Sequence, residues 1–401
     1  MDVLTTDLLP EVWPGIFHQL IITNSQYWLD CARSDPAHFA QETPQALRAI
    51  GYGLVLPEAW AATRDLIRQL NDLMMRRGQG IEWESYLTQA IARSNQLSDP
   101  VEIEFRLYLG NLYRLQGRLP EARTLLQTGL EQCDQYGARE HYWALLNLLA
   151  MVMRLDGRQG EARHYCQQVL DATEATIIER AEAYNVKGLV AYDQREWDDA
   201  LDQLASSLQL YQRLDDPFQI GRVLTNRGSV LQRKGYLDEA ASSFTEAMSY
   251  FHRAGDQIET YKAVTNLGNV YLMKKDYDQA IRHYQQALPV FQNCHFLVTL
   301  AHIYNNLGMA HTRLENWETA KYYFSASIYA WQRTNDRYNL ANVLDNLGDM
   351  LIKYGQTQSA YDILTQTLDI LNQADDSPGI IRLRGVIQNR LTQIETMPSA
   401  E

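Results

Sequence analysis

The sequence repeats itself at intervals of about 40 residues over most of its length. A small residue recurs at that spacing: Gly110, Ala150, Gly188, Gly228, Gly268, Gly308 and Gly348. Twelve positions after each of them stands an alanine: Ala122, Ala162, Ala200, Ala240, Ala280, Ala320 and Ala360. An apolar or aromatic residue follows every alanine at a distance of one helical turn. A period of this length is typical of arrays of stacked structural repeats.

Each repeat has the pattern of a helical hairpin. Between Tyr261 and Cys294, apolar residues recur at helical spacing in two segments, which the polar turn 274–276 separates. No strand-like alternation competes with this pattern. We expect Gly268 and Ala280 to face each other across the hairpin, because only small side chains let two helix axes approach closely.

The fifth repeat carries a family resemblance. Its matching residues are Asn266, Leu267, Gly268, Asn269, Tyr271, Tyr277, Ala280, Tyr284, Ala287 and Leu288. This pattern resembles the tetratricopeptide repeat (TPR), and the 40-residue period is similar to that of the Pins/LGN class and of the TPR arms of bacterial signalling regulators. The resemblance implies an all-α fold: a TPR-type α-solenoid, a right-handed superhelix of helical hairpins, with an N-terminal helical module.

The pattern divides the chain into four parts. Residues 1–98 are predicted to form a helical N-terminal module, and 57–96 within it are compatible with one degenerate hairpin. Residues 99–376 hold seven TPR-like hairpins. Residues 377–395 carry one apolar stripe and are predicted to form a C-terminal capping helix. Residues 396–401 are predicted to be a disordered tail.

Composition excludes several classes of function. With 36 Lys and Arg against 49 Asp and Glu, the formal net charge is -13, which disfavours nucleic-acid binding. No apolar stretch is long enough to span a bilayer, and no charged segment precedes one as in a signal peptide, so we expect no integral membrane segment. The four cysteines lie far apart, with no spacing that suggests a zinc site. We therefore expect a cytoplasmic protein without metal or cofactor.

Motifs of catalysis are missing from the sequence. Neither a phosphate-binding G-x-x-x-x-G-K-[ST] loop, nor G-x-S-x-G, nor H-E-x-x-H occurs. His283, His295, His302 and His311 are close in sequence, but they fall on different repeats or different helix faces, so we do not expect them to bind a metal. The chain is predicted not to be an enzyme.

The resemblance places a partner-binding site on the concave side of the array. In the family, peptide-facing residues lie six and three positions before the hairpin glycine and one, four and five after it. Carried onto this sequence, the predicted partner-binding residues are Asn185, Arg222, Ser229, Arg233, Lys262, Asn269, His302, Asn305 and Arg313.

The middle of this predicted groove has an unusual charge for so acidic a chain. The fourth to sixth repeats place four cations and no carboxylate at the partner-facing positions. Carboxylates take equivalent positions toward the two ends: Glu104, Glu182, Asp193, Asp345 and Asp349. Two interpretations stay open, an acidic-peptide site in the middle of the groove or a solvated polar face whose charges balance their neighbours.

Asparagine recurs just before the repeat glycine, at Asn226, Asn266, Asn306 and Asn346. We expect these amides to hydrogen-bond between neighbouring hairpins more often than to a ligand. The predicted function is a non-catalytic scaffold or assembly factor that binds another protein or peptide. The alternative is a regulatory switch that senses a peptide or protein signal through the repeat arm. A homo-oligomer is compatible with both.

Overall fold

The computed structural model describes residues 13–77, 80–294, 296–373 and 377–396. In these ranges the chain forms α-helices and two short 3₁₀ turns, without any β-strand, which confirms the predicted all-α fold. His295 and residues 397–401, most of the predicted tail, lie outside the described ranges.

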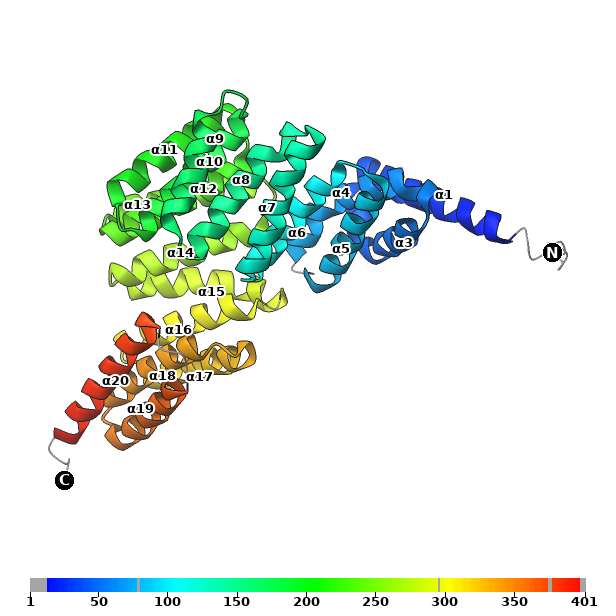
Figure 1. Ribbon diagram of the computed structural model, residues 1–401. Coiled ribbons are helices and arrows are strands. Elements are labelled where there is room, and N and C mark those ends of the chain that lie inside the picture. Colours follow the sequence, from blue (N-terminus) through cyan, green and yellow to red (C-terminus); the bar gives the residue numbers. More distant parts are fainter. Residues whose placement is uncertain (1–12, 78–79, 295, 374–376, 397–401) are drawn as a thin grey trace, which may run out of the picture. The chain divides into compact units, whose positions relative to one another are not determined.

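The chain divides into two compact units, residues 1–194 and 195–401 (Figure 1). The first unit holds α1 (Trp13–Ser34), α2 (Pro36–Gln41), α3 (Thr43–Val55), the 3₁₀ turn Pro57–Ala59, α4 (Trp60–Arg77), α5 (Gly80–Leu97), α6 (Val101–Leu115), α7 (Leu119–Tyr136), the 3₁₀ turn Arg139–His141, α8 (Tyr142–Leu155), α9 (Gln159–Asp171) and α10 (Ile177–Asp193). The second holds α11 (Trp197–Arg213), α12 (Pro217–Lys234), α13 (Leu237–Arg253), α14 (Gln257–Met273), α15 (Tyr277–Asn293), α16 (Leu297–Arg313), α17 (Trp317–Thr334), α18 (Arg337–Lys353), α19 (Thr357–Asn372) and α20 (Pro378–Thr396).

Consecutive helices pair as hairpins inside each unit. The pairs are α6 with α7 and α8 with α9 in the first unit, and α12 with α13, α14 with α15, α16 with α17 and α18 with α19 in the second (Figure 1). In each pair of the second unit the first helix carries the repeat glycine and the second begins close to the repeat alanine, as the 40-residue pattern predicted.

The repeat glycine lies closest to a ring one helical turn beyond the repeat alanine. A Cβ atom built on Gly268 would lie only 2.6 Å from the ring of Tyr284, one helical turn beyond Ala280. Gly228 and Gly308 have the same relation to Phe244 and Phe324. The glycine therefore makes room for a large buried ring inside the hairpin.

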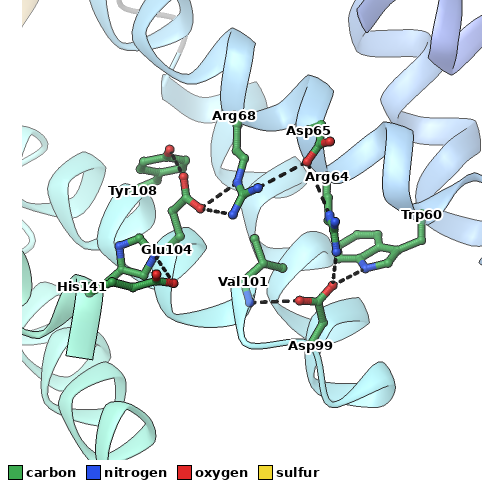
Figure 2. Close-up of polar contacts among 10 residues, drawn as sticks. Trp60, Arg64, Asp65, Arg68, Asp99, Val101, Glu104, Tyr108 and His141 are labelled. Carbon is green, nitrogen blue, oxygen red and sulfur yellow. Dashed lines mark hydrogen bonds and ion pairs between the residues drawn. The ribbon is translucent and has the colours of Figure 1, made fainter. Parts of the chain in front are cut away.

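The first hairpin is joined to the N-terminal helices by polar contacts within the first unit. Trp60 Nε1 donates to Asp99 Oδ2 at 2.8 Å, and Arg64 Nη1 donates to the same oxygen at 3.1 Å (Figure 2). Arg68 Nε donates to Glu104 Oε2 at 2.7 Å. These bonds link α4 to the start of α6, beside the buried ring of Trp60.

The last helix, α20, packs on α19 and α18. Its buried side chains follow the predicted apolar stripe: Ile380, Leu383, Ile387 and Ile394. They join the core cluster of α17 to α19.

Candidate functional site

Eight of the nine predicted partner-binding residues lie in the second unit, on the first helices α12, α14 and α16. Similar caps fix the register of two of these helices. Asp216 Oδ1 accepts from the backbone N–H of Gln219 at 3.1 Å, and Asp256 Oδ1 accepts from that of Glu259 at 3.0 Å. Each cap precedes the first basic position of its helix by six residues, so Arg222 and Lys262 occupy equivalent places.

The predicted positions form two rows with a polar strip between them. We call Arg222, Lys262 and His302 the first row, and Arg233, Met273 and Arg313 the second row. On each helix the two row members are eleven residues apart, which is three turns, so they share one face and are separated by about 16 Å along the axis. All six side chains are half-exposed or exposed. We call this surface of α12, α14 and α16 the first-helix face.

Amides join neighbouring first helices on this face. Asn306 Nδ2 of α16 donates to Asn269 Oδ1 of α14 at 2.8 Å, and Asn346 Nδ2 of α18 donates to Asn305 Oδ1 of α16 at 3.0 Å. These bonds confirm, for Asn306 and Asn346, the predicted bonding between hairpins. The buried Tyr284 also donates to Asn269 Oδ1, at 2.7 Å. The side chains of Asn269 and Asn305 are therefore held in fixed orientations, because their amide oxygens accept these hydrogen bonds.

Among the described residues, we find no hydrogen bond donated by the side-chain amide of Asn269. The nearby hydroxyls of Thr225, Ser229 and Thr265 donate to backbone carbonyls of their own helices, at 2.9, 3.0 and 2.9 Å. Their oxygen lone pairs can still accept a hydrogen bond. The polar strip thus offers both donors and acceptors to a bound chain.

The cations of the two rows differ in their surroundings. Lys262 Nζ lies 2.6 Å from Glu259 Oε1 in a surface ion pair, and Arg222 Nη1 donates to Gln219 Oε1 at 2.6 Å. A surface ion pair such as that of Lys262 with Glu259 contributes at most about 1 kcal/mol. Arg233 and Arg313 are exposed. We find no ion pair of Arg313 within the described ranges.

His302 completes the first row. Its ring packs edge to face against Trp331, with the ring centroids 4.9 Å apart. Burial against this neighbour lowers the pKa of His302, while the charge of Asp336 opposes the shift. The imidazole is therefore neutral at pH 7 in the unbound protein.

The carboxylates of α18 at equivalent positions are neutralised from within the protein. Arg390 of α20 places Nε 3.0 Å from Asp345 Oδ1 and Nη1 2.6 Å from Asp349 Oδ1. Lys353 bonds to the other oxygen of Asp349. Burial raises the pKa of Asp345; burial acts in the same direction on Asp349, but its hydrogen bonds from Lys353 and Arg390 outweigh this and lower its pKa.

Two carboxylates of the first unit are paired in the same way. Arg68 binds Glu104 through Nε and Nη2 (Figure 2). Arg154 Nη1 lies 2.9 Å from Asp193 Oδ2. The sequence predicted these acids but not their cations. For Arg390 the sequence did contain a signal of its pairing with Asp349. The two residues are 41 positions apart, and the same offset separates Asn346 from Asn305.

Asn185 does not belong to the site. It lies on α10 in the first unit and is 0% exposed, so its side chain cannot contact a partner.

Other kinds of site find no support in the described part of the chain. No three His, Cys, Asp or Glu side chains there gather in an arrangement that could hold a metal ion. None of the described helices is both long and apolar enough to cross a membrane.

Solved structures with the same fold include three repeat proteins of low sequence identity. A signal transduction ATPase with numerous domains, which carries a tetratricopeptide repeat sensor and comes from Pyrococcus horikoshii, matches 92% of this chain with a TM-score of 0.65 and 15% identity. This chain spans 55% of the length of that protein. The Cut9–Hcn1 hetero-tetramer of the APC/C matches with a TM-score of 0.57 and 17% identity, covering 95% of this chain and 69% of the other. A Rap protein complexed with competence and sporulation factor matches with a TM-score of 0.51 and 15% identity, covering 87% and 98%.

Sequence comparison identifies the family directly. Curated proteins yield no match. A tetratricopeptide repeat model, however, matches residues 104–175, 219–293 and 299–373, which together exceed half of the chain, and a second tetratricopeptide repeat model matches residues 180–214. The chain belongs to the tetratricopeptide repeat family.

Proposed function

We propose that this protein is a non-catalytic docking protein that holds an acidic segment of another protein on the first-helix face of α12, α14 and α16. The observation that carries the proposal is the local charge. At the partner-facing positions this face has four cations and no carboxylate, in a chain whose formal net charge is -13. Complementary charge of this kind increases the association rate and selects the partner.

The pairing of the neighbouring carboxylates supports the same conclusion. If Asp345 and Asp349 had no cationic partner, their negative charges would repel an acidic ligand at the edge of the site. Arg390 and Lys353 neutralise them.

The relatives are compatible with docking. One solved neighbour is a Rap protein complexed with competence and sporulation factor. No catalytic family matches the chain. The cysteines are free, and three of them, Cys31, Cys133 and Cys166, are buried thiols, which fits a reducing compartment such as the cytoplasm.

The proposal is tested with a fluorescent Glu-rich peptide and two charge-reversal variants. The test variant carries Arg233→Glu, Lys262→Glu and Arg313→Glu. The control variant carries Arg253→Glu, Arg282→Glu and Lys321→Glu, which change exposed cations of the second helices α13, α15 and α17 by the same total charge. We expect anisotropy to show loss of binding in the test variant alone, with helical circular dichroism unchanged in both. Equal loss in both variants would mean that only net charge matters, and no loss in the test variant would reject the site.

The second candidate function is a regulatory switch that changes the state of residues 1–98. The contacts of α4 with α6 favour it, because Arg68 and Trp60 tie the N-terminal helices to the first hairpin. One solved neighbour carries a tetratricopeptide repeat sensor. Small-angle scattering with and without the Glu-rich peptide separates the two functions, because a docking protein keeps its dimensions and a switch changes them.

A further inference from the structure

The helices α1 and α3 of the first unit expose large apolar side chains to solvent. Phe17, Leu20 and Tyr27 of α1 are 53, 60 and 54% exposed, and Tyr52 and Val55 of α3 are 51 and 72% exposed. Single exposed apolar residues are ordinary on a protein surface, but a group on two neighbouring helices marks an interaction site. We call these five residues the N-terminal patch.

Helical geometry and one ring contact bring the members of the patch together. Phe17 and Leu20 are three residues apart on α1, and Tyr52 and Val55 are three residues apart on α3, so each pair lies on one side of its helix. The rings of Phe17 and Tyr52 pack edge to face with centroids 6.1 Å apart, which joins the two pairs. Tyr27 lies two turns beyond Leu20 on the same side of α1. The patch therefore extends over both helices, which contact each other at the N-terminal end of the first unit (Figure 1).

The other sides of α1 and α3 are already packed. Trp28 of α1 and Ile50 of α3 are buried in the core cluster of the first unit. A Cβ atom built on Gly53 of α3 would collide with Thr63 Oγ1 of α4 and lie 3.1 Å from Ser25 Oγ of α1, so the three helices are in close contact. Helices fixed in this way present the patch to solvent and cannot turn it inward.

The patch carries no formal charge. From Trp13 to Leu29 the sequence has no Asp, Glu, Lys or Arg, and Arg48 is the one such residue in α3. The exposed Arg48 and Asp30 stand at its rim. A charged partner gains no electrostatic attraction on such a surface. Two copies of this chain, each with a formal net charge of -13, can meet there without opposing like charges.

The size of the patch fits a pair of identical surfaces. Large side chains that are exposed by half or more offer about 100 Å² each, so the five offer about 500 Å² on each copy. Two copies would therefore bury about 1,000 Å² of apolar surface in addition to the polar rim, which reaches the size of a specific protein interface. Twofold symmetry lets one patch serve on both copies.

The C-terminal helix shows a different solution for an end of the array. α20 exposes Arg382, Gln388 and Asn389 alongside Ile381 and Val386. Polar residues thus separate the exposed apolar ones, as solubility requires of a terminal element. In the N-terminal patch the apolar side chains adjoin one another across two helices, and a second copy would cover them.

We infer that the N-terminal patch is the contact surface of a homodimer, in which α1 and α3 of one copy pack against the same helices of a second copy. Because the patch belongs to the first unit and the first-helix face to the second, the dimer is independent of the proposed docking function. A homodimer carries two first-helix faces.

Sedimentation equilibrium of the full chain over a range of protein concentrations tests the dimer. We expect a reversible species of twice 46.2 kDa. Leu20→Glu with Val55→Glu should leave only monomer, because the dimer would bury four unpaired carboxylates. Tyr322→Glu with Ile381→Glu is the matched control, since these side chains are 68 and 56% exposed on α17 and α20, and it should dimerise like the wild type.

A milder variant keeps the test decisive if the glutamates disturb folding. Leu20→Ala with Val55→Ala should weaken dimerisation at least tenfold, while circular dichroism and thermal melting of the monomer stay unchanged. A wild-type protein that is monomeric at every concentration would overturn the inference. So would a dimer that both patch variants leave intact.

Three further measurements address other occupants of the patch. Residues 1–12 lie outside the described ranges; if a chain without them dimerises and the full chain does not, that segment covers the patch and the inference is wrong. Flotation of the wild type with phosphatidylcholine vesicles, lost in the glutamate variant, would assign the patch to a membrane surface instead. Added NaCl should preserve or strengthen the dimer, because screening weakens the repulsion between two acidic chains. Dissociation by salt would show that ion pairs, and not the patch, hold the copies together.

Discussion

Arg390 Nη1 of the last helix donates to Asp349 Oδ1 of α18 at 2.6 Å, across the same sequence offset at which Asn346 donates to Asn305 at 3.0 Å. The amide links between first helices are thus continued by an ionic link at the C-terminal end of the array. Arg390 also forms an ion pair with Asp345, which is 6% exposed, so one guanidinium pairs with two carboxylates. The helix α20 therefore both covers the last hairpin and neutralises its acidic face.

Replacing Arg390 by Ala should destabilise the second unit. Asp345 would be left buried without a cation, and the cost should be roughly 2 kcal/mol, below that of a fully buried pair because the arginine is partly exposed. Urea unfolding followed by circular dichroism measures this change, and Arg382→Ala on the same helix is the control, since Arg382 is exposed. The additional change Asp345→Asn should recover part of the loss; failure to do so would show that Arg390 acts through its packing.

Gly268→Ala and Gly385→Ala should have opposite effects on stability. Both glycines lie inside helices, where alanine is favoured by about 1 kcal/mol. A Cβ on Gly268 would meet the buried ring of Tyr284 at 2.6 Å, and this overpacking should cost more than the gain, about 1–3 kcal/mol. Nothing lies within 4 Å of a Cβ on Gly385. Thermal melting should therefore show a fall for the first variant and a rise for the second, and a rise for both would mean that the hairpin relaxes easily.

Removing the amide of Asn306 should weaken both stability and docking. Asn306→Ala loses the bond to Asn269 Oδ1, a net contribution of about 1 kcal/mol. Tyr284→Phe removes the other bond to the same oxygen. Because the two bonds share one acceptor, the double variant should lose more than the sum of the single variants. Additive losses in denaturant unfolding would show that Asn269 is oriented by other contacts.

Docking of the acidic peptide should strengthen as the pH falls through the titration of His302. The pKa of this imidazole is lowered in the free protein, and a bound carboxylate favours the imidazolium and raises it, so binding takes up a proton. Uptake of a proton means higher affinity at lower pH, by about threefold between about pH 7.5 and about pH 5.5. His302→Gln should give a flat profile in anisotropy titrations, and His311→Gln, on the same helix, should keep the wild-type slope.

Asp99 should make the stability of the first unit depend on pH. Burial favours its neutral form, but the hydrogen bonds from Trp60, the Val101 backbone and Arg64 outweigh burial and lower its pKa. A lowered pKa stabilises the fold above the unfolded value of about 3.9 and loses that contribution as the pH falls through the folded value. Asp99→Asn should therefore cost about 1 kcal/mol at pH 7, and this cost should shrink progressively as the pH falls below the unfolded value. A cost that does not change with pH would exclude the carboxylate charge as its cause.

Periodic small residues were enough to predict the hairpins, because a 40-residue repeat of glycine, alanine and aromatic positions is compatible with few folds. The positions of Arg222, Lys262 and Arg313 on one face could also be derived, since helical geometry fixes which residues share a face. Contacts between residues that lie far apart in the sequence could not be derived in this way. That Tyr284 is the closest neighbour of Gly268 could not be derived, because the neighbour of a glycine depends on how the two helices of its hairpin are rotated.

The sequence by itself determined the helices, their pairing and the basic character of the middle repeats, because these follow from local periodicity and from residue type. Tertiary structure alone decided which charges remain available to a partner. Asn185 is buried, and Asp345 and Asp349 are paired with Arg390 of α20, the second helix after their own. Burial and ion pairing depend on distances in space, and a single sequence specifies those distances only after the chain has packed.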